Sequence, residues 1–217
     1  LPDRSDGRVP EEEYEAHLRR LLEALAEHGR SSPELELLAE TVGRIWEINR
    51  EALNQARSDY LTGVLNRRGL FVALQPIAYL ARRNRQPVGV LMVDIDNFKA
   101  VNDTHGHQQG DRVIARVAHC IHGRLRASDV LGRYGGEEFL ALMTPVDPEH
   151  LGEIADTIRL AVREGTREEI PVTVSIGVAH GLLEGDVETE IQELIRRADQ
   201  ALLAAKGGGK NRVVVSS

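Results

Sequence analysis

An unbroken apolar stretch in the middle of the chain constrains the fold more than any other feature of the sequence. Residues 88–93 read Val-Gly-Val-Leu-Met-Val and are followed by Asp94. Apolar runs without polar alternation are typical of strands that are buried on both faces of a sheet. A strand of this kind needs a covering layer on each side, so the sequence predicts a domain of helices and strands in layers.

Helical and strand-like patterns alternate along the chain from residue 58. Helices are expected at about 67–83, 109–125, 148–164 and 190–205, and further strands at about 130–134, 138–143, 170–179 and 212–215. Gly135-Gly136 separates two adjacent strands, which predicts a hairpin. The order β-α-β-β-α-β is that of a ferredoxin-like sheet, so we expect an α/β (α+β) fold in which helices cover such a sheet, with extra elements added.

Residues 1–57 differ from the rest and predict a helical hairpin, because a break at residues 29–33 separates two helical patterns. The second pattern has heptad spacing through Leu35, Leu38, Val42, Ile45, Asn49, Ala52 and Ala56. Asn49 on this seam can fix the register of a parallel dimer. The same stripe suits packing against the first helix, and both hold if two hairpins form a four-helix bundle. We expect a dimerisation and signalling segment at 1–57 and a second domain at 58–217.

Charge, apolar runs and cysteine usage exclude several classes of protein. The net charge of −7 argues against broad binding to nucleic-acid polymers, although a single nucleotide is still compatible. No apolar run approaches the roughly 20 residues that cross a bilayer, so no membrane segment is expected within this chain. The lone Cys120 suits a cytoplasmic location, and the neighbouring His119 and His122 lack further ligands for a metal. Leu1 in place of Met is compatible with a piece of a longer protein that has a sensor or membrane anchor upstream.

Two groups of carboxylates mark a candidate metal site. Asp94 follows the buried strand, where a carboxylate is costly unless it is paired or binds a cation. Glu137 and Glu138 stand at the tip of the predicted hairpin, after two glycines that let the backbone approach a ligand closely. If the hairpin lies beside the strand of Asp94, then Asp94 and Glu137 converge, as in sites that hold Mg²⁺ together with substrate phosphates. A helix cap or a salt bridge is the alternative for Asp94 alone.

Polar residues near glycines indicate a nucleotide as the ligand. Asn102, His107 and Asp111 lie in the stretch that leads into the helix at 109–125, and their amide and carboxylate edges can pair with guanine. Lys206 and Lys210 flank three glycines near the C-terminus, which suits a phosphate grip, although the Walker pattern is absent. Each feature taken alone is more typical of an ordinary loop or helix cap.

Several of these residues stand in the order and spacing of known motifs. Residues 59–68 are similar to DxLTGLxNRR, residues 94–111 match DxDxFKxxNDxxGHxxGD, and residues 135–139 read Gly-Gly-Glu-Glu-Phe. Residues 175–178 read Ser-Ile-Gly-Val, and Ala198, Asp199 and Ala201 stand as in RADxAxYxAK. Together these motifs resemble the GGDEF family of diguanylate cyclases over residues 58–217. The resemblance implies a helix-covered sheet as in nucleotidyl cyclases.

The resemblance implies an enzyme that joins two GTP molecules into cyclic di-GMP and releases two pyrophosphates. Asp94, the carbonyl of Ile95 and Glu137 would then hold Mg²⁺ or Mn²⁺. Glu137 would also be the candidate base, and Lys99 would stabilise phosphate charge. The implied substrate-binding residues are Asn102, His107, Asp111, Gly135, Gly136, Lys206 and Lys210. Two positions depart from the family, since Lys210 stands where Arg is common and Leu203 where an aromatic residue is frequent.

The resemblance also implies a homodimer and feedback inhibition. Each domain would bind one GTP, so two domains must face each other, and the segment 1–57 is placed to control this. Arg126-Ala127-Ser128-Asp129 resembles the RxxD site at which cyclic di-GMP, the product, inhibits. A surface ion pair between Arg126 and Asp129 is the alternative. The alternative function is a catalytically silent GGDEF domain that serves as a nucleotide receptor or interaction module, against which the intact polar residues argue.

Overall fold

The computed structural model describes residues 20, 37, 40–45 and 57–216. The chain divides into two units, and the second, Asn54–Ser217, carries the helices and strands named below. In the first unit residues 40–45 are helical, and Ile45 of the predicted seam exposes 54% of its surface. Five seam positions lie outside the described residues, as does the break at 29–33; these positions are Leu35, Leu38, Asn49, Ala52 and Ala56. The helical hairpin and the boundary at residue 58 therefore stay predictions.

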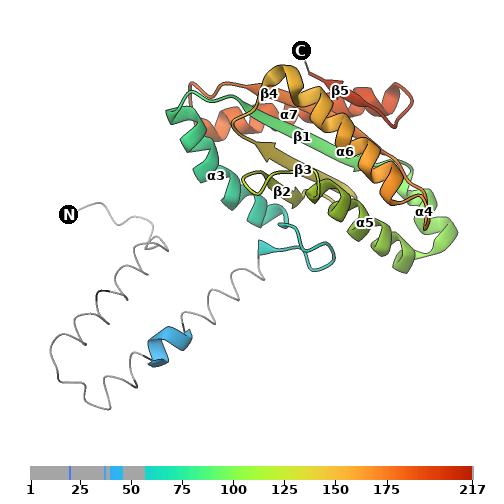
Figure 1. The fold of residues 1–217 in the computed structure, drawn as a ribbon, viewed down its shortest axis with the longest axis horizontal. Helices are drawn as coiled ribbons and strands as arrows, with labels where there is room; N and C mark the ends of the chain where they lie inside the picture. The colour runs from blue at the N-terminus through green and yellow to red at the C-terminus, as the bar shows by residue number, and fades with distance from the viewer. Residues whose placement is uncertain (1–19, 21–36, 38–39, 46–56, 217) are drawn as a thin grey trace. The chain divides into compact units, whose positions relative to one another are not determined.

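The second unit is built on a five-stranded mixed sheet, shown in Figure 1. Its strands lie in the order β2 (Val130–Arg133), β3 (Glu138–Met143), β1 (Val88–Ile95), β4 (Val174–Gly181) and β5 (Val213–Val215). The central strand β1 is antiparallel to both β3 and β4, and β5 is parallel to β4. All eight residues of β1 are buried, so the prediction of a strand covered on both faces is confirmed.

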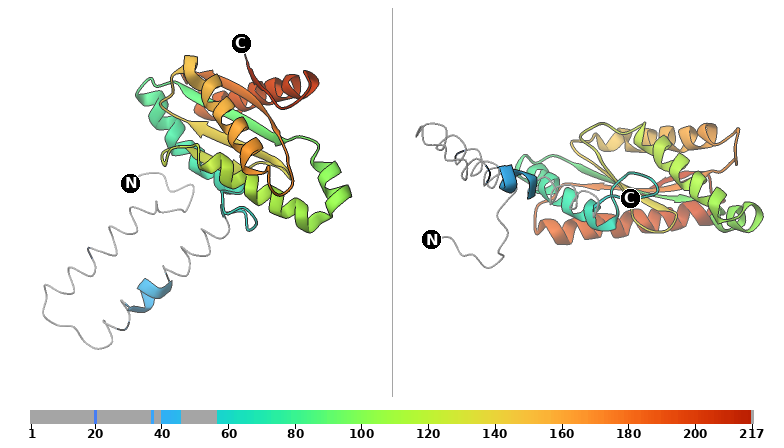
Figure 2. Two further views of the ribbon diagram at one scale, coloured as in Figure 1. Left: turned by 45° about the vertical axis from the view of Figure 1, so that its right-hand side comes forward. Right: turned by 90° about the horizontal axis from the view of Figure 1, so that it is seen from below.

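Helices cover both faces of the sheet, as the two views of Figure 2 show. The helices α3 (Arg67–Arg83) and α7 (Val187–Gly207) lie on one face, and α5 (His107–His122) and α6 (Leu151–Gly165) on the other. Alternate residues of β1 serve the two cores, since Val90 and Met92 pack with α3 and α7 while Leu91 and Val93 pack with α5 and α6. The layered α+β fold expected from the sequence is confirmed.

The structure differs from the predicted elements at four places. A short helix, α4 (Phe98–His105), precedes α5, because Gly106 with φ of 82° interrupts one helical path. Strand β4 begins at Val174 rather than 170, after Pro171, which has no N–H to donate to a ladder. Helix α7 begins at Val187, where Asp186 accepts a hydrogen bond from the backbone N–H of Thr189. A turn of 3-10 helix, η1 (Pro148–His150), precedes α6.

Among the described helices, none has both the length and the apolar character needed to cross a bilayer.

Candidate functional site

The pairing of β1 with the hairpin brings the predicted metal-binding residues together. Asp94 stands opposite Glu138 in the antiparallel register of β1 and β3. The backbone N–H of Ile95 donates to the carbonyl oxygen of Glu137, at 3.3 Å. The end of β1 and the tip of the hairpin are thus neighbours, and Asp94, Ile95 and Glu137 lie around one point at this edge of the sheet.

A cation from the C-terminal end of α7 completes this cluster. The ammonium Nζ of Lys206 lies 2.8 Å from Oδ2 of Asp94, whose side chain is only 6% exposed. Burial raises the pKa of Asp94, and the hydrogen bond from Lys206 offsets this only in part. Burial also raises the pKa of Glu137, and the negative charge of Asp94 raises it further. Two carboxylates therefore share one partly desolvated place, which costs free energy unless a cation lies between them.

The chemistry of this donor set suits a hard divalent cation. The carboxylates of Asp94 and Glu137 and the carbonyl of Ile95 are oxygen donors, which Mg²⁺ and Mn²⁺ prefer. Within the described part of the chain, no three His, Cys, Asp or Glu side chains gather as a complete ligand set. A cation held here would therefore need oxygen ligands from elsewhere, as Mg²⁺ does when phosphates complete its shell.

The close approach of α7 to the sheet sets the place of Lys206. At Gly177 of β4, a Cβ atom would collide with the backbone of Ala198 and Leu202 in α7. Only glycine allows this contact, which fixes the helix on the strand next to β1. Lys206, two turns beyond Ala198, then reaches the buried carboxylate of Asp94. Sequence patterns do not predict this ion pair, because Asp94 and Lys206 are far apart along the chain.

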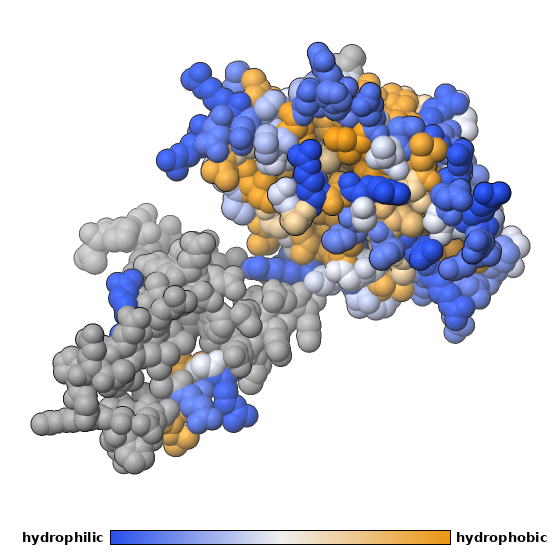
Figure 3. All heavy atoms as spheres, viewed as in Figure 1, coloured by the Kyte–Doolittle hydropathy of each residue, from blue (hydrophilic) through white to orange (hydrophobic). Residues whose placement is uncertain are grey.

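The residues predicted to read a base lie on α4 and α5. Asn102 is half-buried in α4, and its side chain lies directly against Gly110 of α5, where any Cβ atom would collide with the amide oxygen. Gly110 therefore lets α5 pack closely against Asn102 of α4, and Asp111 is the next residue along α5. The side chains of His107, Asp111 and Lys99 are exposed. The surface around α4 and α5, on the right of Figure 3, is predominantly hydrophilic.

The second predicted lysine lies in a tight turn after α7. Lys210 and Asn211 both adopt left-handed backbone conformations, with φ of 63° and 44°. The ammonium of Lys210 donates to the side-chain oxygen of Asn97, two residues beyond the end of β1. This contact brings Lys210 to the same end of β1 as Asp94 and Lys206.

A clamp that the sequence patterns did not reveal holds the hairpin tip. Arg133 at the end of β2 donates to the carbonyl of Gly136 through Nε (3.1 Å) and Nη2 (2.6 Å). Its Nη1 also lies 3.1 Å from Oδ2 and 3.2 Å from Oδ1 of Asp59. Both side chains are largely buried, at 16% and 13% exposed. The motif at residues 59–68 does not predict this contact, through which Asp59 supports the loop of Gly135, Gly136 and Glu137.

The residues of the predicted inhibitory site line a cavity that contains none of Asp94, Glu137 and Lys206. Arg126 and Asp129 contribute to a cavity of about 450 Å³ together with Arg124, Asp147 and His150. The carboxylate of Asp129 accepts a hydrogen bond from the backbone N–H of Arg126 at 2.8 Å. Within the described residues, no side-chain ion pair joins Arg126 to Asp129, so the contact that joins them is this backbone-to-carboxylate hydrogen bond.

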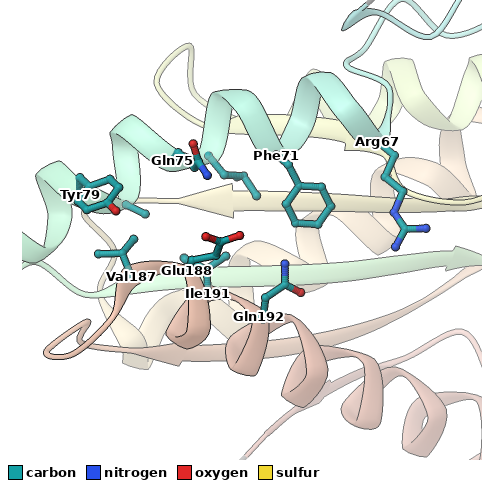
Figure 4. A pocket seen from close by; sticks show the side chains of 10 residues that line it. Arg67, Phe71, Gln75, Tyr79, Val187, Glu188, Ile191 and Gln192 are labelled. Carbon is teal, nitrogen blue, oxygen red and sulfur yellow. The ribbon is translucent and has the colours of Figure 1, made fainter. Parts of the chain in front are cut away.

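A further cavity, of about 280 Å³, lies between α3 and α7 on the opposite face of the sheet. Figure 4 shows Phe71 and Tyr79 of α3 facing Val187 and Ile191 of α7 across it. Its lining contains none of the predicted site residues. At one end of this cavity, the guanidinium of Arg67 stacks over the ring of Tyr134, 4.7 Å from its centroid. Asp94 and Glu137 do not line this cavity.

Comparison with known proteins agrees with the motifs. The sequence matches the family described as diguanylate cyclase, GGDEF domain, over residues 56–212. The diguanylate cyclase DgcM of Escherichia coli K12 is 39% identical over 164 residues, which are 74% of this chain and 38% of that protein. The response regulator PleD of Caulobacter vibrioides is 38% identical over 169 residues, 75% of this chain and 37% of PleD. This chain thus spans under two fifths of the length of these relatives.

Two solved structures are similar in fold. The coiled coil and GGDEF domain of DgcB from Caulobacter crescentus, in complex with c-di-GMP, has a TM-score of 0.74 and 30% identity, covering 85% of this chain and 100% of that one. The diguanylate cyclase SiaD of Pseudomonas aeruginosa, in complex with its activator SiaC, has a TM-score of 0.69 and 32% identity, covering 94% and 75%. Motifs, fold and sequence matches therefore agree that this chain belongs to the diguanylate cyclase, GGDEF domain family.

Proposed function

We propose that this chain is a diguanylate cyclase, which condenses two GTP molecules into cyclic di-GMP and two pyrophosphates. The observation that carries the proposal is the gathering of Asp94, Glu137 and Lys206 at one end of β1. Two carboxylates and a cation at one point are suited to a divalent cation and to phosphates. The relative DgcM, which is 39% identical over 164 residues, is a diguanylate cyclase, and this supports the same reaction.

The reaction consists of two equivalent phosphoryl transfers. The 3′-oxygen of one GTP bonds to the α-phosphorus of the other, and the bond from that phosphorus to the bridging oxygen breaks. Pyrophosphate leaves, and the 3′-hydroxyl proton passes to a base, for which Glu137 is the candidate. Repeating the transfer in the opposite direction closes the ring.

The remaining polar residues would bind and orient the nucleotide. Mg²⁺ or Mn²⁺, held by Asp94, Ile95 and Glu137, would supply charge neutralisation and activation of the attacking hydroxyl. The carboxylate of Asp111 and the amide of Asn102 would pair with the donors and acceptors on the edge of guanine. The phosphates would be held by cations and by hairpin backbone, and the residues concerned are Lys99, Lys206, Lys210, Gly135 and Gly136. His107 would line the nucleotide site.

A homodimer follows from the stoichiometry, since each domain would hold one of the two GTP molecules. The segment 1–57 would bring the domains face to face, and the crystallised part of DgcB includes a coiled coil as well as a GGDEF domain. The exposed Ile45 supports a partner at the heptad seam. A cytoplasmic location, expected from the single Cys120, belongs to the same proposal.

Cyclic di-GMP would also inhibit the enzyme at the cavity of Arg126 and Asp129. The guanidinium of Arg126 can stack on a purine or donate to phosphate, and Asp129 can accept from guanine N–H groups. A cavity of about 450 Å³ with both residues in its lining supports this reading. Added cyclic di-GMP should lower initial rates, and Arg126→Ala should relieve that inhibition without loss of GTP turnover. Equal inhibition of both proteins would place the regulatory site elsewhere.

The direct test of the proposed function is identification of a product. Purified protein is incubated with GTP and Mg²⁺, and the nucleotides are then identified by mass. We expect cyclic di-GMP together with pyrophosphate. Recovery of unchanged GTP from a folded protein that still binds GTP would favour a catalytically silent nucleotide receptor instead.

A further inference from the structure

A second carboxylate at the end of β1, that of Asp96, is as deeply buried as that of Asp94. The residue is 5% exposed, and its side chain accepts three hydrogen bonds from within the fold. The hydroxyls of Thr173 and Ser175 each donate to it at 2.6 Å. The backbone N–H of Asn211 donates to it at 3.0 Å. Ser175 belongs to β4 and Thr173 directly precedes this strand, whereas Asn211 belongs to the turn that carries Lys210.

These partners explain how an unfavourable turn is held in place. Lys210 and Asn211, with φ of 63° and 44°, are in the left-handed region, which costs free energy for residues other than glycine. Asn97, with φ of 57°, adopts the same conformation next to Asp96. Such conformations persist where the surrounding structure fixes them. Asp96 lies between these residues and accepts from the backbone of Asn211, so its carboxylate joins the two segments.

The side chain of Asn211 has a separate anchor. Its amide oxygen accepts a hydrogen bond from Nη1 of Arg159 on α6, at 2.8 Å. Arg159 in turn donates to Asp156 at 2.7 Å. The turn is thus attached through its backbone to Asp96 and through a side chain to α6. This separation allows each attachment to be removed without the other.

We propose that Asp96 is a positioning residue, which holds the Lys210 turn where it can grip the phosphates of GTP, and that it is not a metal ligand. The inference rests on the proposed function, because it takes the bound molecule to be GTP. A carboxylate that already accepts three hydrogen bonds and points into the fold has little left to offer a cation. Asp94 faces Lys206 instead, so the two aspartates of one motif have different tasks.

The test is the affinity for a non-reactive GTP analogue, measured by calorimetry in Mg²⁺. Asp96→Ala should weaken binding about tenfold or more, since a charge-assisted hydrogen bond to the turn is lost. Asp96→Asn should stay within about threefold, because its oxygen can accept from Asn211 and Thr173 while its amide donates to Ser175. Ser175→Ala is the matched control, which removes a hydrogen bond to Asp96 on the strand side and should leave the affinity within about twofold.

A second pair of variants removes the hydrogen bond between Asn211 and Asp96 by changing the exposed turn instead of the buried carboxylate. The inference can then be tested even if Asp96→Ala does not fold. Asn211→Pro removes the N–H and excludes the positive φ, and should weaken binding about tenfold. Asn211→Gly keeps both and loses only the contact with Arg159, so it should bind nearly as the wild type does.

Four outcomes would overturn the inference. Unchanged affinity in Asp96→Ala and Asn211→Pro would show that the turn needs no tether. Equal weakening in Ser175→Ala and Asp96→Ala would point to general damage. A tenfold or greater rise in the Mg²⁺ requirement of Asp96→Asn would make Asp96 a ligand. Failure of the wild type to bind the analogue would contradict the proposed function and the inference with it.

Discussion

The clamp between Asp59 and Arg133 gives a prediction whose size follows from the geometry. In Asp59→Ala, Arg133 keeps its bonds to Gly136 but loses its carboxylate partner in a place where both side chains are less than a fifth exposed. Removal of one partner costs about 3–5 kcal/mol for a buried pair and about 0–1 kcal/mol for an exposed pair. Because both side chains are still partly exposed, a value between these two ranges, about 2 kcal/mol, is appropriate.

Asp59 has a second task that adds to this cost. Its Oδ1 accepts from the backbone N–H of Thr62 at 3.0 Å and from the hydroxyl of Thr62 at 2.7 Å. Losing this turn adds about 1 kcal/mol, for a total of about 3 kcal/mol. For a domain of this size, about 2–4 °C of Tm accompany each kcal/mol, so Asp59→Ala should melt about 6–12 °C lower.

The assay is thermal unfolding followed by circular dichroism, with Glu164→Ala as the control. Glu164 pairs with Arg167 at 3.6 Å, and both side chains are more than 70% exposed, so its loss should change stability by less than about 0.5 kcal/mol. Asp59→Ala should also turn over GTP more slowly at temperatures where it is folded, because the loop before Glu137 is held less firmly. A Tm loss no larger than that of Glu164→Ala would refute the reasoning.

Three further predictions concern the pKa of Glu137, the choice between GTP and ATP, and the dimer. The raised pKa of Glu137 means that the folded state binds its proton more tightly than the unfolded state, so in EDTA Glu137→Gln should raise Tm at pH 7 and the gain should shrink towards pH 5. Melting curves across this range check the sign, and a gain that does not change with pH would contradict it. GTP should greatly outcompete ATP, because the Asp111 carboxylate repels the acceptor N1 of adenine, and comparable rates of product formation from ATP and GTP would rule this out. Ile45→Glu should weaken the dimer and lower activity at dilute enzyme, as measured by light scattering over a concentration series. If neither changes, the helices of the segment 1–57 pack only within their own chain.

The fold and the centre of the site could be predicted because they depend on local patterns. A run of apolar residues predicts a doubly covered strand wherever it occurs, and β1 is buried along its whole length. Two glycines between strands predict a hairpin, and once that hairpin lies beside β1, Asp94 and Glu137 must be neighbours. Helix α4 (Phe98–His105) was missed, because its residues fall in the polar stretch that leads into the helix predicted at 109–125.

Contacts between distant segments could not be predicted from pattern. Nothing in the spacing of Asp94 and Asp96 tells which one faces Lys206 and which one faces Asn211, because that depends on where α7 ends against β4. The pairing of Asp59 with Arg133 likewise depends on how the loop after residue 57 docks beside β2. Such partners are set by tertiary packing, and a single sequence contains no periodic signal for them.

The most direct measurement of the central claim is the rate of cyclic di-GMP formation by Glu137→Ala. Wild type should convert GTP in Mg²⁺, and the variant should lose at least about 100-fold in rate while it keeps its circular dichroism spectrum. The tip of the hairpin carries little core packing, so the fold should survive. The control variant is Glu164→Ala, which removes an exposed carboxylate on α6 and should keep the wild-type rate. A folded Glu137→Ala protein that retains substantial turnover would contradict the assignment of the catalytic centre.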